Sequence, residues 1–353
     1  MRLLFLTGSR GEWGYIRPVI QEAQRRGHRC NVVVTNMHLS EEHGSTWKEL
    51  DCGDIHRIPM ASHDDNASHG YALGGFLAQF APYLCRHKPD WLVLAGDRGE
   101  QLMGAIAGAY SYIPTAHIQA GEVSGNIDNS ARLAMAKLCH LHFAATEECA
   151  DRLRAMGEEA WRCLHVGAPQ IDEMVSYTPV RPMAERFCLV VMHPTTDEVA
   201  NAGQQILALK QACLSIPGKK VWIAPNNDPG WQDIYRSLPE GVTSNMPRMR
   251  YLDHLRYCDC IIGNSSSGIL EAPTYGVPAV NIGNRQTGRE RGDNVFDCKE
   301  WTPSEIYRTY QDAMRWKRVT LKLYGDGHSA PRIVDALETN AKNPRLTKKE
   351  QTY

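Results

Sequence analysis

The 353-residue sequence lacks any apolar stretch near the roughly 20 residues that a membrane-spanning helix needs. Its apolar start, residues 3–6, is far too short for the core of a signal peptide. It also lacks an excess of charge of either sign: the formal net charge is −1, so no general basic field favours nucleic acid. We therefore expect a soluble, cytoplasmic protein in which a few placed residues hold any anionic ligand.

The cysteines show no metal or disulfide pattern. Eleven are present, but no C-x-x-C pair occurs, and Cys258 and Cys260 lie too close together for a usual metal knuckle. No cluster of histidine, aspartate and glutamate has the spacing of a metal site. We expect reduced, mostly buried thiols, no metal and no cofactor.

Hydrophobic residues make up 42% and charged residues 22%, as in ordinary globular proteins, and no internal repeat is evident. The length suits two α/β domains better than one core. Short apolar runs alternate with helical patterns, which predicts parallel, doubly wound sheets. The predicted strands are 3–6, 30–35, 91–94, 115–118 and 142–145, then 188–192, 220–224, 260–262 and 279–282.

The alternating pattern restarts after Pro179 and Pro182, which predicts a hinge near 175–186. We accordingly predict a first Rossmann-like domain over 1–178 and a second over 179–343. Residues 344–353 are polar and rich in lysine, and are expected to form a frayed tail.

The strongest local motif is Gly263-Asn264-Ser265-Ser266-Ser267-Gly268, which follows a predicted buried strand and opens a helix. Backbone N–H groups and serine hydroxyls at such a turn suit a phosphate or diphosphate. Glu271, one helical turn further on, suits ribose hydroxyls. The alternative is a serine-rich helix cap without a ligand.

Arginines follow two predicted strands. Arg10 comes after the first strand, and Arg285 and Arg289 come after Asn281-Ile282-Gly283. Because functional loops of a doubly wound sheet lie at the carboxyl ends of its strands, these guanidinium groups are expected to meet in one cleft. They suit a diphosphate, since each binds two oxygens and stays charged. The alternative for any one of them is a solvated surface arginine.

Carboxylates form a third group. Asp97, Arg98 and Glu100 follow one strand, and Gln119, Glu122 and Asp128 lie on a glycine-containing loop after the next. Crowded carboxylates raise each other's pKa, which suits acid and base roles at a sugar carbon. The alternative is a loop of surface acids and helix caps.

His193 ends the first strand of the second half, where it is suited to protonating or hydrogen-bonding a departing phosphate oxygen. A lone histidine is more often structural. We interpret His140 and His142, two residues apart at a strand start, as structural.

These residues together resemble the UDP-N-acetylglucosamine 2-epimerase family, specifically its hydrolysing branch, which makes N-acetylmannosamine or related sugars for sialic-acid-type pathways. The similar stretches span nearly the whole chain in the family's order: 7–10, 37–40, 96–98, 117–128, Arg132 with Lys137, 193–196, 225–230, 263–273 and 281–289. The resemblance implies two Rossmann-like domains, as in the GT-B glycosyltransferases, with the nucleotide in the central cleft. It also implies a UDP-sugar substrate and a homodimer.

The resemblance assigns roles to individual residues. It implies that Ser265 and Ser266 hold the diphosphate, that Glu271 holds the ribose, and that Arg10 and Arg285 lie near the phosphates. It implies that Asp97, Gln119, Glu122, Asp128 and His193 form the catalytic group, with Asp97 and Asp128 matching catalytic carboxylates. Further substrate-binding candidates are His38, Arg98, Asn129, Arg132, Asn226, Ser267 and Gly268.

The implied reaction removes the proton at sugar C2 and expels UDP, and water then adds to the glycal to give the C2-inverted free sugar. The chain departs from the family pattern at three positions. Gln119 replaces a glutamate common in relatives, Asn129 replaces an acid, and Leu133 replaces a histidine. Because an amide or a leucine is no carboxylate base, two alternatives stay open: a glycosyltransferase or non-inverting hydrolase, and a catalytically silent UDP-sugar binder.

Overall fold

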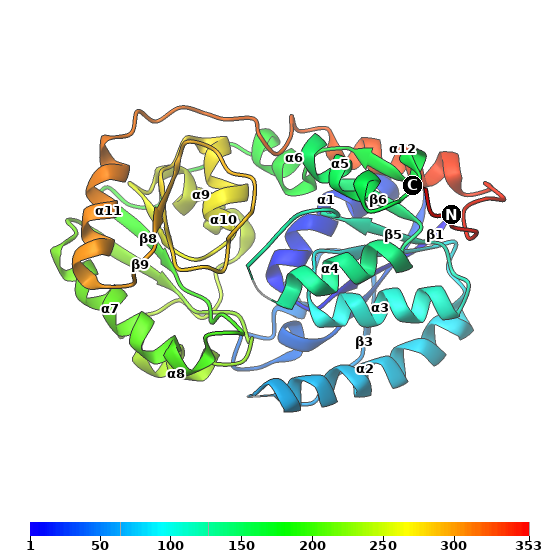
Figure 1. Cartoon of the computed structure of the whole chain (residues 1–353), viewed down its shortest axis with the longest axis horizontal. Coiled ribbons are helices and arrows are strands. Elements are labelled where there is room, and N and C mark those ends of the chain that lie inside the picture. Colours follow the sequence, from blue (N-terminus) through cyan, green and yellow to red (C-terminus); the bar gives the residue numbers. More distant parts are fainter. Residues whose placement is uncertain (64, 126, 353) are drawn as a thin grey trace.

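The computed structural model describes residues 1–63, 65–125 and 127–352 as two α/β lobes (Figure 1). The first lobe contains a seven-stranded sheet in the order β3-β2-β1-β4-β5-β6-β7, and the second a five-stranded sheet in the order β12-β11-β10-β8-β9. Every strand pair within these sheets is parallel. This confirms the predicted pair of doubly wound, Rossmann-like units.

The elements of the first lobe alternate between strand and helix. They are β1 (Arg2–Thr7), α1 (Arg10–Arg25), β2 (Arg29–Val34), β3 (Asp54–Arg57), α2 (Asn66–His87), β4 (Trp91–Ala95), α3 (Gly99–Tyr110), β5 (Thr115–Ile118), α4 (Ile127–Leu138), β6 (Leu141–Ala144), α5 (Glu147–Ala155), β7 (Cys163–His165) and α6 (Pro169–Ser176). The predicted boundary at 178/179 falls between α6 and the first strand of the second lobe, and it stays a prediction.

The second lobe repeats the alternation and is followed by one more helix. Its elements are β8 (Phe187–Val191), α7 (Ala202–Ser215), β9 (Lys219–Ile223), α8 (Trp231–Ser237), α9 (Arg248–Tyr257), β10 (Ile261–Gly263), α10 (Ser267–Leu270), β11 (Ala279–Ile282), β12 (Val295–Cys298) and α11 (Pro303–Arg315), with α12 (Ser329–Asn340) near the end of the chain.

The strands that the sequence does not predict are β3, β7 and β12. All three lie at sheet edges and are short and partly exposed. Central strands such as β4 are buried along their whole length and therefore form continuous apolar runs. These three edge strands carry no such run, which is why the apolar pattern does not reveal them.

Each sheet has one switch point, where the winding direction reverses. In the first sheet it lies between β1 and β4, and in the second between β10 and β8. Ligands of doubly wound sheets bind beyond the carboxyl ends of the strands at such points. The loops after these four strands begin with Gly8, Gly96, Met192 and Asn264, so four of the predicted site segments meet where the fold expects a ligand.

The C-terminal segment returns to the first lobe, as the orange-to-red trace in Figure 1 shows. Helix α12 contacts α1, and its apolar positions Ala330, Ile333, Val334 and Leu337 join the core under the first sheet. The sequence instead assigns residues up to 343 to the second domain. The sequence of α12 shows the spacing of apolar residues that is typical of an amphipathic helix. It does not show which lobe this apolar face covers, because that depends on the apolar surface of α1.

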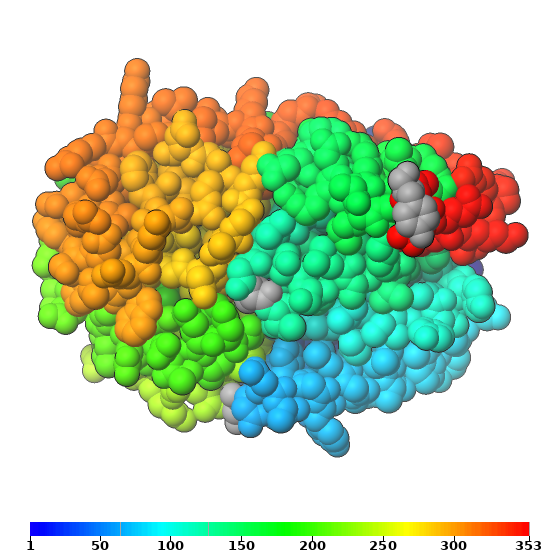
Figure 2. Space-filling view, in the orientation of Figure 1, coloured from blue at the N-terminus to red at the C-terminus, as the bar shows by residue number. Residues whose placement is uncertain are grey.

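The expected frayed tail is wrong for residues 345–352, which pack on the first lobe (red, Figure 2). Leu346 is buried in the same core as α12. The Lys349 ammonium donates to the carbonyls of Ala136 at 2.7 Å and Cys139 at 2.8 Å, at the C-terminal end of α4. A cation at a helix C-terminus satisfies carbonyls that have no intrahelical partner.

Arg162 is the residue that ties this tail down, so Arg162→Met should lower the free energy of unfolding by about 3 kcal/mol. Its guanidinium is fully buried and donates to Glu159 and to the backbone carbonyls of His140, Arg345, Leu346 and Lys348 at 2.6–3.0 Å. Urea denaturation measures the loss. The control Arg315→Met, on an exposed i,i+3 pair, should change little; equal effects of the two substitutions would contradict this account.

Among the described residues, no helix combines the length and the apolarity needed to cross a bilayer. The eleven cysteines are all free thiols, and all but Cys85 are buried, as predicted.

Candidate functional site

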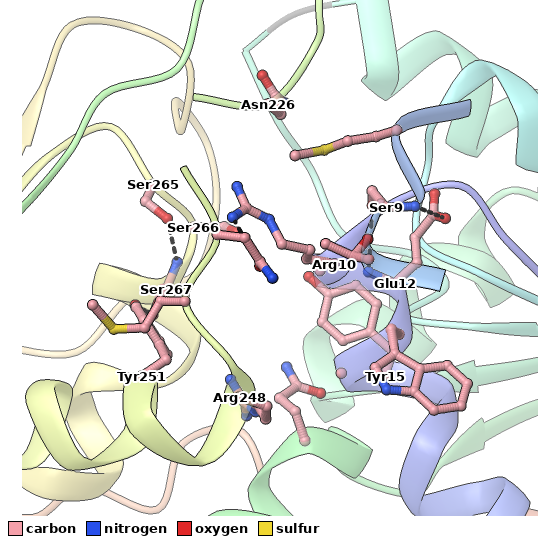
Figure 3. A pocket seen from close by; sticks show the side chains of 18 of the residues that line it. Ser9, Arg10, Glu12, Tyr15, Asn226, Arg248, Tyr251, Ser265, Ser266 and Ser267 are labelled. Carbon is pink, nitrogen blue, oxygen red and sulfur yellow. Dashed lines mark hydrogen bonds between the residues drawn. The ribbon is translucent and has the colours of Figure 1, made fainter. Parts of the chain in front are cut away.

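A cavity of about 650 Å³ lies between the two lobes, within the range of small-molecule sites. Its walls come from both switch points, with Arg10 reaching from the first lobe toward Ser266 on the second (Figure 3). The predicted residues that line it are Arg10, His38, Asp97, Arg98, Asp128, His193, Asn226, Ser265, Ser266, Ser267, Glu271 and Arg285.

A smaller cavity of about 60 Å³, here called the polar chamber, lies beside the main one. Gln119, Glu122 and Arg132 line it together with Asp97, Asp128, Ser266 and Arg285, which border both cavities. The other residues lining the polar chamber are Tyr15, Gly96, Ser124, Gln286 and Arg289.

Two predicted binding residues line neither of these cavities. Asn129 uses its side-chain oxygen to accept a hydrogen bond from the Ser124 backbone N–H at 3.4 Å. Gly268 lies inside the loop, where an added Cβ would approach Ala279 Cβ to 3.1 Å. Asn129 and Gly268 therefore pack within the loops that border the site and do not face the cleft.

The serine loop depends on a tight glycine. At Gly263 φ is +137°, and an added Cβ would lie 1.9 Å from the carbonyl oxygen of Val191, so only glycine fits. Next to it, the Asn264 amide accepts from the His193 backbone N–H at 2.7 Å and donates to the His193 carbonyl at 2.8 Å. This contact fixes the serine loop beside His193.

Ser265, Ser266 and Ser267 turn directly into α10, which ends at Leu270. The helix is shorter than the sequence suggests. Hydroxyl groups and loop amides are therefore the main donors that this loop offers to an anion, more than the dipole of a long helix.

Arg10 is a mostly enclosed cation that forms no direct ion pair with a described carboxylate, and only the more distant Glu49 partly offsets its charge. It projects from the start of α1 and donates to the carbonyls of Ser244 at 3.0 Å and Ala224 at 3.4 Å in the second lobe. Burial lowers its pKa to about 10. Its direct contacts are all neutral oxygens, from backbone carbonyls and the Asn245 side chain, so the guanidinium is under-compensated and an anion in the cleft would restore the balance.

Arg285 has a similar environment. Burial lowers its pKa, and its nearest carboxylate, Asp228, is 4.0 Å away. Its Nε atom is buried without a partner in the described structure. Arg10 and Arg285 thus place two incompletely compensated cations at the same cavity, and their role in binding an anion stays a prediction.

Arg98 and His38 also border the cavity, but contacts within the protein occupy their polar atoms. Arg98 donates to Glu100 at 3.0 Å and crosses to Asp228 at 2.7 Å, which links the lobes. The two ring nitrogens of His38 contact the hydroxyls of Thr7 at 3.0 Å and Thr46 at 2.7 Å. Both side chains therefore shape the site more than they offer free groups to a ligand.

The two carboxylates matched to acid and base roles face the junction of the cavities. Asp97 follows β4 and forms an ion pair with the buried Arg132. Asp128 lies in the first turn of α4 and borders both cavities. The structure thus brings together the two carboxylates that lie on separate segments of the sequence.

Gln119 and Glu122 lie deeper in the polar chamber. Gln119 has a left-handed backbone, with φ +63°, and its amide donates to the Gln170 side chain at 3.1 Å. Glu122 pairs with Arg289 at 3.1 Å, and burial raises the pKa of its carboxyl. An amide at 119 cannot take a proton, so any proton transfer in this chain falls to the carboxylates.

His193 is held as a neutral imidazole. Burial and Arg285 lower its pKa well below the ordinary value. Its Nδ1 accepts a hydrogen bond from the Asn226 backbone N–H at 3.0 Å, which places the proton of the neutral ring on Nε2. His193 therefore offers a hydrogen-bond donor to the cleft.

Arg248 is a site residue that the sequence did not reveal. It opens α9 and binds Glu173 at 2.8 Å and Glu271 at 2.6 Å. Glu271 also accepts from the Ser267 hydroxyl at 2.6 Å. These partners come from distant segments, so no local motif marks Arg248, and the carboxylate expected to bind ribose is already partly occupied.

Several buried histidines predict loss of stability in acid. Burial lowers the pKa of each below the ordinary 6.5: His38 and His117 to about 3, His43 and His140 to about 4, and His193 well below. Below pH 6.5 the unfolded chain binds protons that the folded chain excludes, so stability present above pH 6.5 is lost as the pH falls. At pH 5.5 each of these histidines should lower the free energy of unfolding by about 1 kcal/mol.

Glu12 and Glu122 act in the opposite direction, because burial raises the pKa of both carboxyls, with Glu100 adding to the rise to about 8 at Glu12. Their contribution is lost as the pH rises above 4.5. The five imidazoles outnumber them, so urea unfolding should show lower stability at pH 5.5 than at pH 7.5. Equal midpoints at the two pH values would contradict this balance.

Comparison with known proteins agrees with this geometry. The family model described as UDP-N-acetylglucosamine 2-epimerase matches residues 21–338. The UDP-N,N'-diacetylbacillosamine 2-epimerase (hydrolyzing) of Legionella pneumophila is 32% identical to this chain. The match covers 100% of this chain and 99% of the relative. The UDP-N-acetylglucosamine 2-epimerase of Neisseria meningitidis is 31% identical over 88% of this chain and 87% of its own.

Solved structures show the same fold. The Neisseria meningitidis enzyme bound to UDP-N-acetylglucosamine superposes with a TM-score of 0.74 at 19% identity, covering 96% of this chain and 100% of that one. The Methanocaldococcus jannaschii enzyme in complex with UDP-N-acetylglucosamine and UDP superposes with a TM-score of 0.75 at 18% identity, covering 96% of this chain and 100% of that one. From the family match and its 32% identical relative, this chain belongs to the UDP-N-acetylglucosamine 2-epimerase family.

Proposed function

We propose that this protein is a hydrolysing 2-epimerase that converts a UDP-linked 2-acetamido sugar to UDP and the C2-inverted free sugar. The observation that carries the proposal is the shared cleft: two under-compensated guanidinium groups and the serine loop border the same cavity as Asp97 and Asp128. A diphosphate held by the cations leaves the attached sugar beside the carboxylates.

In the proposed reaction one of these carboxylates removes the proton from C2. The C2–H electrons form a C1=C2 double bond while the C1–O bond breaks, and its electrons leave with UDP. Arg10, Arg285 and the neutral His193 Nε2–H stabilise the charge on the departing phosphate oxygen. Water then adds its hydroxyl to C1, and C2 receives a proton on the opposite face, which balances the reaction without a redox step.

The Legionella pneumophila relative supports the hydrolysing type, because its name states that chemistry. A second candidate, a UDP-sugar binder or hydrolase without inversion, is favoured by one observation: Gln119 brings an amide, paired with Gln170, into the polar chamber, and an amide cannot act as a base.

The test is incubation with UDP-N-acetylglucosamine and UDP-N,N'-diacetylbacillosamine in deuterated water. We expect UDP release together with an inverted free sugar that carries deuterium at C2, detected by proton NMR. Sugar released without inversion or deuterium would identify a plain hydrolase. Binding without turnover, restored to turnover by Gln119→Glu with Asn129→Asp, would identify a silent binder.

We also propose a cytoplasmic homodimer. Free thiols suit a reducing compartment. The exposed tyrosines Tyr71 on α2 and Tyr110 on α3 lie on neighbouring helices, and residues 66–85 contain no aspartate, glutamate, lysine or arginine. An uncharged helix face suits self-association. Light scattering should give twice the chain mass of 39.6 kDa, and a monomer would contradict the proposal.

A further inference from the structure

The polar chamber contains buried polar atoms that the protein itself leaves unsatisfied. Five residues that line it are at most 8% exposed: Gln119, Glu122, Arg132, Gln286 and Arg289. Each has one buried polar atom without a hydrogen-bond partner in the described structure: Gln119 Oε1, Glu122 Oε1, Arg132 Nε, Gln286 Oε1 and Arg289 Nη1. Such atoms are rare in folded proteins, and five around one cavity indicate an occupant.

The chemistry of these atoms restricts the occupant. Glu122 Oε1 and the two glutamine oxygens are acceptors, and Arg132 Nε and Arg289 Nη1 are donors. The occupant must therefore both donate and accept hydrogen bonds, as an amide does with its N–H and C=O. The chamber, at about 60 Å³, has room for a small substituent but not for a sugar ring, and the Tyr15 ring supplies an apolar wall for a methyl group.

The position of the chamber identifies the carbon that bears this substituent. Ser266 and Arg285, on the diphosphate side, border the chamber as well as the main cavity. Asp97 and Asp128, the proposed acid and base for C2, border both as well. A group that lies near the phosphate-bearing carbon and near these carboxylates is attached to C2.

We propose that Glu122 and Arg289 bind the 2-acetamido group of the substrate, with Glu122 accepting from its N–H and Arg289 donating to its carbonyl oxygen. This inference rests on the proposed binding of a UDP-sugar. It gives Glu122 a specificity role in place of the proton transfer expected from the sequence, because Glu122 lines only the polar chamber, whereas Asp97 and Asp128 also border the main cavity.

The two lobes contribute one residue each to this recognition. Glu122 follows β5 in the first lobe, and Arg289 follows β11 in the second. The loops that carry them are joined by a hydrogen bond from the Gly125 N–H to the Arg285 carbonyl at 3.1 Å. An added Cβ on Gly125 would come within 2.1 Å of the Asn284 carbonyl oxygen, so the loops meet at backbone contact. The acetamido group is therefore recognised only where both lobes close on it.

The test compares dissociation constants of UDP-N-acetylglucosamine, UDP-glucose and UDP by titration calorimetry, in an Asp128→Asn background that prevents turnover. UDP-glucose has a hydroxyl at C2 where the acetamido group stands. We expect the parent to prefer the acetamido sugar by about 30-fold. In Glu122→Gln and Arg289→Met the preference should fall below about 3-fold, while the UDP dissociation constant changes by less than about 3-fold.

Removing one member of a buried ion pair can prevent folding, so the double variant Glu122→Leu with Arg289→Met serves as a second probe in which no charge is left unpaired. It should also lose the preference and keep UDP binding. The exposed pair Glu305–Arg308 provides matched controls, Glu305→Gln and Arg308→Met, which should retain the full preference.

Retained preference in the folded chamber variants, or absence of any preference in the parent, would overturn the inference. Because the measurement needs binding and no turnover, it is separate from the deuterium experiment. A protein that binds selectively but releases no sugar would contradict the proposed reaction alone.

Discussion

Asp97→Asn should reduce the rate of UDP release by about a thousandfold while the affinity for UDP changes little. The substitution keeps the size of the side chain and removes the charge that accepts or delivers the C2 proton. Because Asp97 lies after β4 at the border of both cavities, and the diphosphate ligands come from other segments, binding and chemistry should separate. Steady-state kinetics with UDP-N-acetylglucosamine, with UDP as a competing ligand, measures both.

The same substitution leaves the buried Arg132 without its anion, so its effect on the fold must be measured alongside. Thermal unfolding with and without UDP shows whether the variant is folded and still binds. Asp128→Asn, at the second carboxylate that borders both cavities, should give a similar kinetic loss. As a control, Asp90→Asn alters an exposed carboxylate outside the cleft and should keep the rate. If both cleft variants kept the rate, the acid and base assignment would be wrong.

Arg10→Met should weaken UDP binding by about 100-fold without destabilising the unliganded protein. Most buried arginines stabilise their fold through an ion pair, but Arg10 contacts backbone carbonyls and an asparagine, and burial lowers its pKa. Replacing an under-compensated cation with an apolar chain of similar length removes this desolvation cost. The substitution should therefore weaken UDP binding but leave the free energy of unfolding unchanged or slightly higher.

Titration calorimetry with UDP and urea denaturation of the free protein test this pair of effects. Arg236→Met, at an exposed pair on α8, is the matched control and should change neither. A large loss of stability in Arg10→Met would show that the residue holds the lobes together, and unchanged UDP affinity would show that the diphosphate lies elsewhere.

Much of the candidate site could be predicted because parallel strands end at a common edge. Arg10, Asp97, His193 and Ser265 each follow a buried strand, and the buried strands are the ones that their apolar runs reveal. The strand order then brings those four loops to the two switch points. The residue types in the loops indicate the chemistry, since hydroxyls, guanidinium groups and carboxylates have few other reasons to gather there.

Contacts between distant segments could not be predicted in the same way. Arg248 acts through Glu173 and Glu271, and Arg98 through Asp228, and neither pair shares a motif. The sequence also could not show that His38 is enclosed by two threonines. These roles depend on which side chains face each other after the lobes close.

The two-sheet architecture and the loops that border the cavity follow from the sequence alone, because local apolar runs mark the buried strands and polar residues directly follow them. Three features depend on the three-dimensional arrangement: α12 and the tail cover the first lobe, Glu122 pairs with Arg289 across the cleft, and Asn129 and Gly268 face away from it. The physical reason is that burial and ion pairing depend on neighbours in space, which the order of residues along the chain does not specify.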